Sequence, residues 1–237
     1  MMESKQVLIF GGTGAIGSAA RKEFLAKGWK PVIVSREPSN LQEASAVTWD
    51  VLANEVPLAP EEIIKRGPFD AVCWAQGQNL NDSIYDFDIN AYRSVMDANV
   101  TFILSSLAAL LRSQALKAGA RLCIVSSIWQ DLSRQNKLSY AVSKAAIKGL
   151  ILSLANDLAK EGYLVNAVLP GALDTQMTRQ NLKPEQIKAI ESATQFNRLA
   201  NLGDVTSAIY YLCSEQNTGV TGQFIKVDLG FSDVRNF

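Results

Sequence analysis

A glycine-rich turn near the start of the chain constrains its fold most strongly. Residues 6–10, QVLIF, form an apolar run of the length of a buried strand. The turn GGTGAIG follows at 11–17, and residues 18–27 then have the pattern of a helix that ends before Gly28. A strand, a glycine turn and a helix in this order form a dinucleotide-binding fingerprint, because glycines let backbone N–H groups approach a pyrophosphate at the helix N-terminus. A plain glycine-rich turn is the alternative interpretation.

A second feature is the pair Tyr140 and Lys144, four residues apart in SYAVSK. Residues 138–161 contain no proline and are rich in Ala, Leu, Ile and Lys, so we expect a helix with both side chains on one face. An ammonium beside a phenol stabilises the phenolate, and we expect it to lower the tyrosine pKa from about 10. Such a tyrosine can serve as a general acid or base. Alone, this short spacing recurs by chance.

A serine at the end of a predicted strand supports the same chemistry. Residues 121–127 form an apolar run that ends in Ser126 and Ser127, thirteen residues before Tyr140. Ligands of open α/β sheets bind beyond the carboxyl ends of the strands. The Ser127 hydroxyl could therefore hold a substrate oxygen against Tyr140, and capping of the next turn is its alternative role.

With these patterns in order, residues 5–230 resemble the short-chain dehydrogenase/reductase family. Asn99 matches the helix asparagine of that family. The resemblance implies a catalytic tetrad of Asn99, Ser127, Tyr140 and Lys144, and hydride transfer between a nicotinamide cofactor and a carbonyl/alcohol pair. Tyr140 would donate the proton in reduction and accept it in oxidation. Lys144 would also bind the nicotinamide ribose, and Asn99 would help to hold a water in a proton relay.

The glycine turn and the family resemblance together imply a set of cofactor contacts. They are Gly11, Thr13, Gly14, Ala15, Ile16, Gly17, Ser35, Arg36, Asp50, Val51, Ala75, Gly77, Tyr140, Lys144, Pro170, Gly171 and Thr175. The second predicted strand ends in Ser35 and Arg36 and has no acidic residue at its tip. An acidic residue there would bind the ribose hydroxyls and repel a 2′-phosphate. A hydroxyl and a guanidinium instead favour NADP(H), with NAD(H) as the alternative. Glu37 could neutralise Arg36.

Two departures from the family pattern leave other functions open. Ala15 stands at a glycine position, and residues 75–77, Ala-Gln-Gly, stand where Asn-Ala-Gly is frequent, so that the asparagine is lost. A nucleotide-sensing protein without catalysis is one alternative. A sugar-nucleotide epimerase is another, because the Gly11, Gly14, Gly17 spacing is closer to that larger branch. We expect no room in this chain for the separate C-terminal substrate domain of such an epimerase.

The predicted fold is α/β: a single Rossmann-like, doubly wound domain over residues 1–237. Strands are expected near 5–11, 30–35, 46–49, 69–75, 120–127, 163–169 and 222–228, with helices between them. The resemblance implies a parallel seven-stranded sheet in the order 3-2-1-4-5-6-7. Residues 172–200 are predicted to form a substrate lid. Its apolar residues either line the pocket or fill the core of the lid: Met177, Ile187, Ile190 and Phe196.

Composition excludes several other classes. The chain has no histidine, which excludes a Ser-His-Asp triad and histidine-bound zinc. Basic and acidic residues number 23 each, so no charge excess indicates nucleic acid. Three scattered cysteines predict neither a disulfide framework nor a metal site. We expect a cytoplasmic enzyme without a signal peptide or a membrane-spanning run.

Two further expectations concern partners. The predicted helices at 88–117 and 138–161 are apolar on more than one face, which together with the resemblance favours a homodimer or homotetramer. The substrate is a small carbonyl or alcohol compound of unspecified class. Cations in 172–200, such as Lys183 and Lys188, are offset by Glu185 and Glu191 and identify no anionic substrate.

Overall fold

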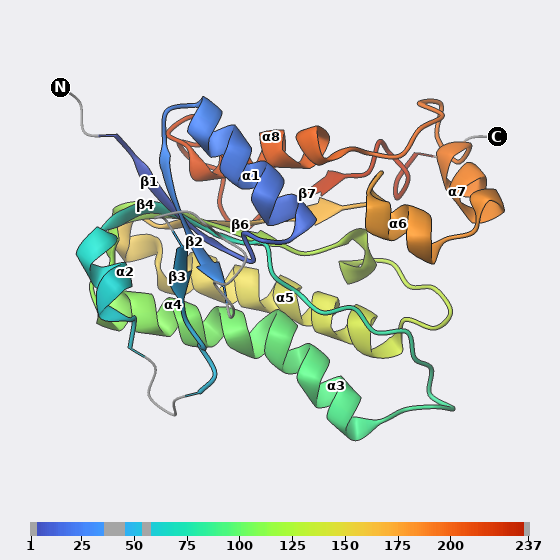
Figure 1. Ribbon diagram of the computed structural model, residues 1–237, viewed down its shortest axis with the longest axis horizontal. Coiled ribbons are helices and arrows are strands. Elements are labelled where there is room, and N and C mark those ends of the chain that lie inside the picture. Colours follow the sequence, from blue (N-terminus) through green and yellow to red (C-terminus); the bar gives the residue numbers. More distant parts are fainter. Residues whose placement is uncertain (1–3, 36–45, 54–57, 235–237) are drawn as a thin grey trace.

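The computed structural model describes residues 4–35, 46–53 and 58–234, and it shows a parallel sheet between two layers of helices (Figure 1). The strands are β1 (Gln6–Phe10), β2 (Lys30–Ser35), β3 (Ala46–Thr48), β4 (Phe69–Trp74), β5 (Leu116–Val125), β6 (Leu164–Pro170) and β7 (Phe224–Val227). They pair in the order β3-β2-β1-β4-β5-β6-β7, and every pairing is parallel. The predicted fold class and strand order are confirmed.

The helices divide between the two faces of the sheet. They are α1 (Ala15–Ala26), α2 (Glu61–Arg66), α3 (Ile89–Met96), α4 (Phe102–Arg112), α5 (Leu138–Asp157), α6 (Gln176–Asn181), α7 (Pro184–Glu191) and α8 (Leu202–Cys213). Figure 1 shows α1 and α8 on one face and α4 and α5 on the other. The strand order reverses between β1 and β4, and such a switch point opens a crevice at the carboxyl ends of the strands.

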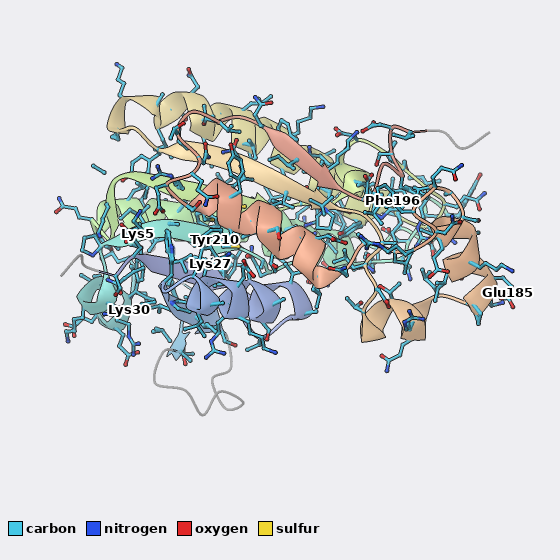
Figure 2. All side chains as sticks on the ribbon, turned by 90° about the horizontal axis from the view of Figure 1, so that it is seen from above. Lys5, Lys27, Lys30, Glu185, Phe196 and Tyr210 are labelled. Atoms are coloured by element: carbon cyan, nitrogen blue, oxygen red, sulfur yellow. The ribbon has the colours of Figure 1, made fainter. Side chains whose placement is uncertain are left out.

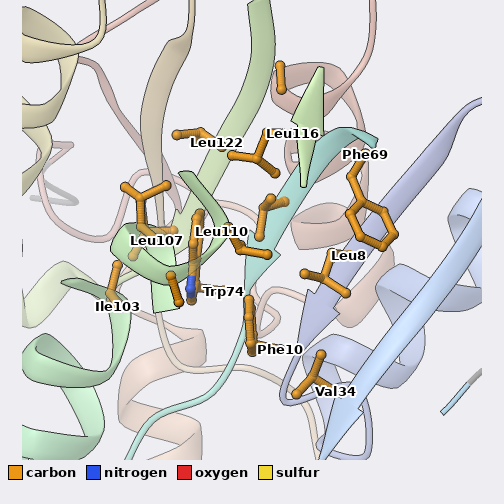
Figure 3. Packing of buried hydrophobic residues seen from close by; sticks show 14 of the residues in the cluster. Leu8, Phe10, Val34, Phe69, Trp74, Ile103, Leu107, Leu110, Leu116 and Leu122 are labelled. Carbon is orange, nitrogen blue, oxygen red and sulfur yellow. The ribbon is translucent and has the colours of Figure 1, made fainter. Parts of the chain in front are cut away.

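Both faces of the sheet are buried, which explains the continuous apolar runs of its strands. In β1, Leu8 and Phe10 belong to the core on the α4 and α5 side, whereas Val7 and Ile9 belong to the core on the α1 and α8 side. Phe10 stacks on Trp74 with ring centroids 5.8 Å apart (Figure 3). These contacts hold β1 and β4, the two strands of the switch point, together.

The cysteines pack as apolar residues. Cys73, Cys123 and Cys213 are free and buried. Hydrogen bonding between neighbouring thiols, together with burial, raises the pKa of Cys73 and of Cys123 well above the usual value. Among the described residues, no group of three or more Cys, Asp or Glu side chains is arranged to hold a metal ion.

The helix expected at 88–117 differs from the prediction. It is divided into α3, a π-helical turn (Asp97–Thr101) and α4, and it ends at Arg112. Gln114 adopts a positive φ of 51°, and β5 then begins at Leu116 instead of near 120. By contrast, the helix that follows Tyr140 closes as expected, with Gly162 in the left-handed conformation at φ 79° after a final 3-10 turn.

Two helical stretches are long and apolar enough to cross a membrane when judged by length and composition alone: Ile89–Arg112 and Leu138–Asp157. Both cover the same face of the sheet, against which Leu107, Leu110, Ile147 and Ile151 are buried. Core helices of this kind satisfy the same criterion, so the finding is weak evidence for a membrane span.

Candidate active site

Tyr140 and Lys144 lie together in the first turns of α5, as their spacing predicts. The Lys144 Nζ is 5.6 Å from the centroid of the Tyr140 ring and donates to the backbone oxygen of Val125 at 3.3 Å. Lys144 is 4% exposed, and burial lowers its pKa to about 8. The lysine is thus fixed between the end of β5 and the phenol.

Ser127 reaches the same phenol from the end of β5. Hydrogen bonding with the Ser127 side chain lowers the pKa of Tyr140, but burial raises it by more, and the net shift is upward from 10.0. The expectation of a lowered pKa is therefore wrong, because desolvation of the phenol outweighs the hydrogen bond with Ser127. Ser127 Oγ also accepts from Trp129 N at 3.3 Å, so it caps the next turn as well.

Asn99 lies in the π-helical turn and connects the loop after β4 to α5. Its Oδ1 accepts from Gln78 N at 2.7 Å, and its Nδ2 donates to Gln78 O at 2.9 Å and to Ser143 Oγ at 2.8 Å. Ser143 Oγ in turn donates to the backbone oxygen of Tyr140 at 2.8 Å. A π-turn inside a helix often occurs at a functional site, and this one aims a buried amide at α5. The role of Asn99 in a proton relay stays a prediction.

Gly77 keeps space open beside Asn99 and Lys144. A Cβ at this position would lie 3.0 Å from Asn99 Oδ1 and 3.6 Å from Lys144 Nζ. Any side chain here would press on both polar groups. The structure therefore brings the four proposed tetrad residues around one small space at the carboxyl ends of β4 and β5.

The glycine turn between β1 and α1 is built by close backbone approaches. A Cβ on Gly11 would fall 2.6 Å from Gln76 N, and a Cβ on Gly17 would fall 2.2 Å from Gly11 O. Gly11 also has a φ of +72°. Thr13, Gly14 and Ala15 are exposed at the top of this turn. The turn is thus tightly packed at Gly11 and Gly17 and exposed to solvent at Thr13, Gly14 and Ala15.

The N-terminus of α1 fits an anionic group such as the pyrophosphate of a dinucleotide. Gly14 is the N-cap and supplies no side-chain cap, and the first turn has no acidic residue. The first N–H groups of a helix lack intrahelical partners, and the helix dipole favours a negative charge there. Ala15 at a glycine position is exposed and does not fill this cradle.

The other predicted cofactor contacts lie along the same edge of the sheet. Ser35 ends β2, Ala75 follows β4 and Pro170 ends β6. Asp50 is exposed after β3, whereas its neighbour Val51 is buried. Ile16 is half-buried in the first turn of α1. Gly171 N donates to Val227 O at the end of β7, and Thr175 is the N-cap of α6. Arg36 and Glu37 lie outside the described residues.

The two ends of the predicted lid lie side by side, next to the end of β6. Leu173 and Ala200 form an isolated parallel bridge, and Asp174 N donates to Ala200 O at 2.8 Å. Between these ends lie α6 and α7, with Glu185 and Phe196 far from Lys5 and Lys30 at the opposite end of the molecule (Figure 2).

The apolar residues proposed to line the lid differ in exposure. Phe196 is 62% exposed, Ile190 is half-buried and Ile187 is buried. The side chain of Met177 lies outside the described residues. Phe196 is thus free to cover a ligand, whereas Ile187 packs inside the segment.

Sequence reasoning missed two polar residues between Ser127 and Tyr140. Lys137 is 5% exposed, and its Nζ is 5.4 Å from the centroid of the Tyr140 ring. Gln130 is also buried, and its amide N and O have no hydrogen-bond partner among the described residues. The signal for Lys137 was its place one helical turn before Tyr140; nothing in the sequence marked Gln130.

Comparison with known proteins agrees with this geometry. A family model described as enoyl-(acyl carrier protein) reductase matches residues 14–232. Glucose 1-dehydrogenase of Gluconobacter oxydans is 28% identical, with 96% of this chain and 92% of the relative covered. A 3-oxoacyl-(acyl-carrier-protein) reductase of Vibrio cholerae is 26% identical, with coverage of 97% and 98%.

Solved structures show the same fold. A short-chain dehydrogenase family protein from Francisella tularensis superposes with a TM-score of 0.83 and 26% identity, covering 98% of this chain and 100% of that one. ElxO, solved with NADP bound, gives a TM-score of 0.80 at 24% identity, with coverage of 97% and 99%.

A parallel sheet with a glycine turn at its switch point, and a tyrosine, lysine and serine gathered beyond it, define a nicotinamide-dependent oxidoreductase. The chain belongs to the short-chain dehydrogenase/reductase family. It is an enzyme that acts on CH–OH or carbonyl groups.

Proposed function

We propose that this chain is an NADP(H)-linked reductase of small carbonyl compounds, with Tyr140 as its general acid. The observation that carries the proposal is the state of Tyr140, which is half-buried, is hydrogen-bonded with Ser127 and has a raised pKa. A phenol with a raised pKa keeps its proton at neutral pH, and a proton donor is what reduction of a carbonyl requires.

Each residue of the site has one part in the proposed reaction. The glycine turn and Lys144 would hold a nicotinamide cofactor, which would supply hydride for the carbonyl carbon. The Ser127 hydroxyl donates a hydrogen bond to the carbonyl oxygen, and Tyr140 O–H transfers its proton to that oxygen as negative charge develops there. The Lys144 ammonium stabilises the phenolate that is left. Asn99 and Gly77 keep Lys144 and α5 in place. In oxidation the proton moves in the reverse direction.

The preference for NADP(H) is proposed from the end of β2. Ser35 offers a hydroxyl there, and no carboxylate stands at that strand end to repel a 2′-phosphate. Arg36 follows immediately in the sequence. ElxO, a protein of the same fold, has been solved with NADP bound.

The decisive test of the reaction is Tyr140→Phe. We expect kcat against a panel of carbonyl compounds to fall by at least about 10²-fold, because the proton donor is lost while the ring remains. The Kd for NADPH, measured by fluorescence titration, should stay close to that of the native protein. Tyr163→Phe, which lies directly before β6 and outside α5, is the matched control and should keep native kcat. A Tyr140→Phe enzyme with near-native kcat would exclude Tyr140 as the acid.

The cofactor preference is tested by Arg36→Ala. Loss of a guanidinium from a phosphate contact should weaken NADPH binding by roughly ten- to a hundredfold and leave NADH binding nearly unchanged. Both dissociation constants are measured by fluorescence titration. Equal losses for the two cofactors would show that Arg36 does not bind the 2′-phosphate.

A further inference from the structure

The connection between Ser127 and Tyr140 carries positive charge beside the reacting phenol. Lys137 directly precedes α5, is 5% exposed, and places its ammonium 5.4 Å from the Tyr140 ring centroid. Arg134 lies three residues earlier, with its guanidinium 5.7 Å from the centroid of the Trp129 ring. Lys144 stands at the phenol as well, so Lys137 is a second buried ammonium at the same ring.

The contacts of Lys137 satisfy only part of its hydrogen-bonding capacity. Its Nζ donates to Asn79 Oδ1 at 2.5 Å and more weakly to Leu80 O at 3.4 Å. Both acceptors are neutral, and an ammonium has three N–H groups. A buried ammonium without a counter-ion is costly, and a carboxylate partner would offset that cost.

The charged groups that face Lys137 do not provide that partner. Burial and the neighbouring Arg134 charge lower the pKa of Lys137 to about 8, while Asp82 acts in the opposite direction. The Asp82 carboxylate, however, accepts from Ser139 N at 3.0 Å and from the Ser139 hydroxyl, at the N-terminus of α5. Among the described residues, no carboxylate forms an ion pair with Lys137 or Arg134.

Gln130 adds an independent sign of a missing ligand in the same connection. Its amide N and O are both buried and have no partner among the described residues. A buried unpaired polar group destabilises a protein by about 1–3 kcal/mol, and such groups are rare unless a ligand or a water completes them.

We propose that this connection binds a carboxylate of the substrate, so that the enzyme prefers oxo acids, and hydroxy acids in reverse, over neutral carbonyl compounds. The inference rests on the proposed reductase function. Lys137 and Arg134 bind the carboxylate, and the carbonyl to be reduced lies a few bonds away at Ser127 and Tyr140. Substrates in which the two groups are close on a short chain fit this separation.

The test compares oxo acids with their methyl esters, which keep the carbonyl and remove the charge. Three pairs are used: acetoacetate, 4-oxopentanoate and 5-oxohexanoate, each beside its ester. Binding to the native protein with NADP⁺ is measured by calorimetry, and kcat/KM is measured with NADPH. At least one acid should exceed its ester by roughly tenfold or more in both quantities, as expected for a charged hydrogen bond.

Variants separate recognition of charge from a merely structural role. Lys137→Gln should bring the acid-to-ester ratio of kcat/KM close to one, whatever change is common to both substrates, whereas Lys137→Arg should restore part of the preference. Lys148→Gln is the control, because Lys148 lies further along α5 and pairs with Asp131. Melting curves establish that each variant is folded.

Three results would overturn the inference. The first is acids that never exceed their esters in the native protein. The second is a Lys137→Gln variant with an unchanged acid-to-ester ratio and native rates, which would show that Lys137 does not contact the substrate. The third is the same unchanged ratio with equal losses for acids and esters, which would show a structural lysine. Failure of the proposed function is distinct from these results, since it would appear as absent NADPH binding or an active Tyr140→Phe enzyme.

Discussion

Lys144 shows how a single residue couples the site to stability. Its ammonium is buried with one neutral acceptor, Val125 O, and burial lowers its pKa from 10.5 to about 8. Between these two pH values the unfolded chain binds more protons than the folded chain, so the free energy of unfolding rises as the pH increases through this window. Below about pH 8 the folded protein must hold the charge in a dry site, and this contribution is unfavourable.

The variant Lys144→Met tests this coupling. A shift from 10.5 to about 8 corresponds to roughly 3 kcal/mol, so the native protein should gain up to that amount relative to the variant between pH 8 and 10.5. Urea unfolding at a series of pH values measures the difference. Lys160→Met, at an exposed position, serves as the control. Parallel pH curves for native and Lys144→Met proteins would contradict a buried charged lysine.

The sequence indicated which residues form the candidate site, but it did not indicate how deeply each of them is buried. Tyr140, Lys144 and Ser127 were found by spacing, because helix periodicity and strand ends place side chains in known directions. The pKa of Tyr140 was predicted in the wrong direction, since burial depends on the packing of residues distant in sequence. Lys137 was overlooked for the same reason: a lysine is usually exposed.

Among the elements, the turn before α1 and the helix α5 contain glycines with opposite roles. A Cβ on Gly17 would come within 2.2 Å of a backbone oxygen, whereas Gly149 in α5 has nothing within 4 Å of its Cβ position. The first glycine is required by a close approach. The second only weakens a helix.

The paired variants Gly17→Ala and Gly149→Ala should therefore act in opposite directions. Gly17→Ala must displace backbone and should weaken NADPH binding by at least about tenfold, with a lower Tm, since strain of 1–3 kcal/mol is typical. Gly149→Ala should stabilise the protein by up to about 1 kcal/mol, the difference in helix propensity, and keep native NADPH affinity. Titration and thermal melting measure both. A Gly17→Ala protein with native affinity would show that the turn does not form the cofactor site.

The boundaries of the elements were predictable where local signals existed. Apolar runs marked the strands, and Gly162 marked the end of the helix that contains Tyr140. The π-helical turn at Asn99 had no such signal. It arises because the Asn99 amide bonds Gln78 and Ser143, which lie on other segments. The early start of β5 likewise depends on pairing with β4, where Phe69 is opposite Leu116.

For the molecule as a whole, one surface is more apolar than a single chain requires. Leu104 on α4 and Val142 and Leu152 on α5 are large apolar side chains with about half of their surface exposed. These helices lie on the same face of the sheet (Figure 1). The predicted homodimer or homotetramer would cover them.

We expect the native protein to self-associate through this face. The double variant Leu104→Lys/Leu152→Lys should shift it towards single chains, because two charges would then be buried without partners. Analytical ultracentrifugation over a range of concentrations measures the change. Leu25→Lys on α1, an exposed leucine on the opposite face, is the control. A native protein that sediments as a single chain would refute the prediction.

The strand order followed from the sequence, because the family resemblance implies the topology, whereas the catalytic role of the tetrad stays a prediction. The predicted preference for NADP(H) stays a prediction, since Arg36 lies outside the described residues. The proposed substrate class rests on the buried Lys137, which the sequence pattern did not distinguish from a surface lysine.

The bridge between Leu173 and Ala200 has a consequence for how such an enzyme can change over evolutionary time. Both ends of the intervening segment are fixed at adjacent points, so replacement of the segment need not disturb the sheet, and the entropy of loop closure grows only slowly with length. The segment can therefore be exchanged as a whole between homologous proteins. Homologous segments transplanted at these two residues offer a route to new specificities on an unchanged catalytic scaffold.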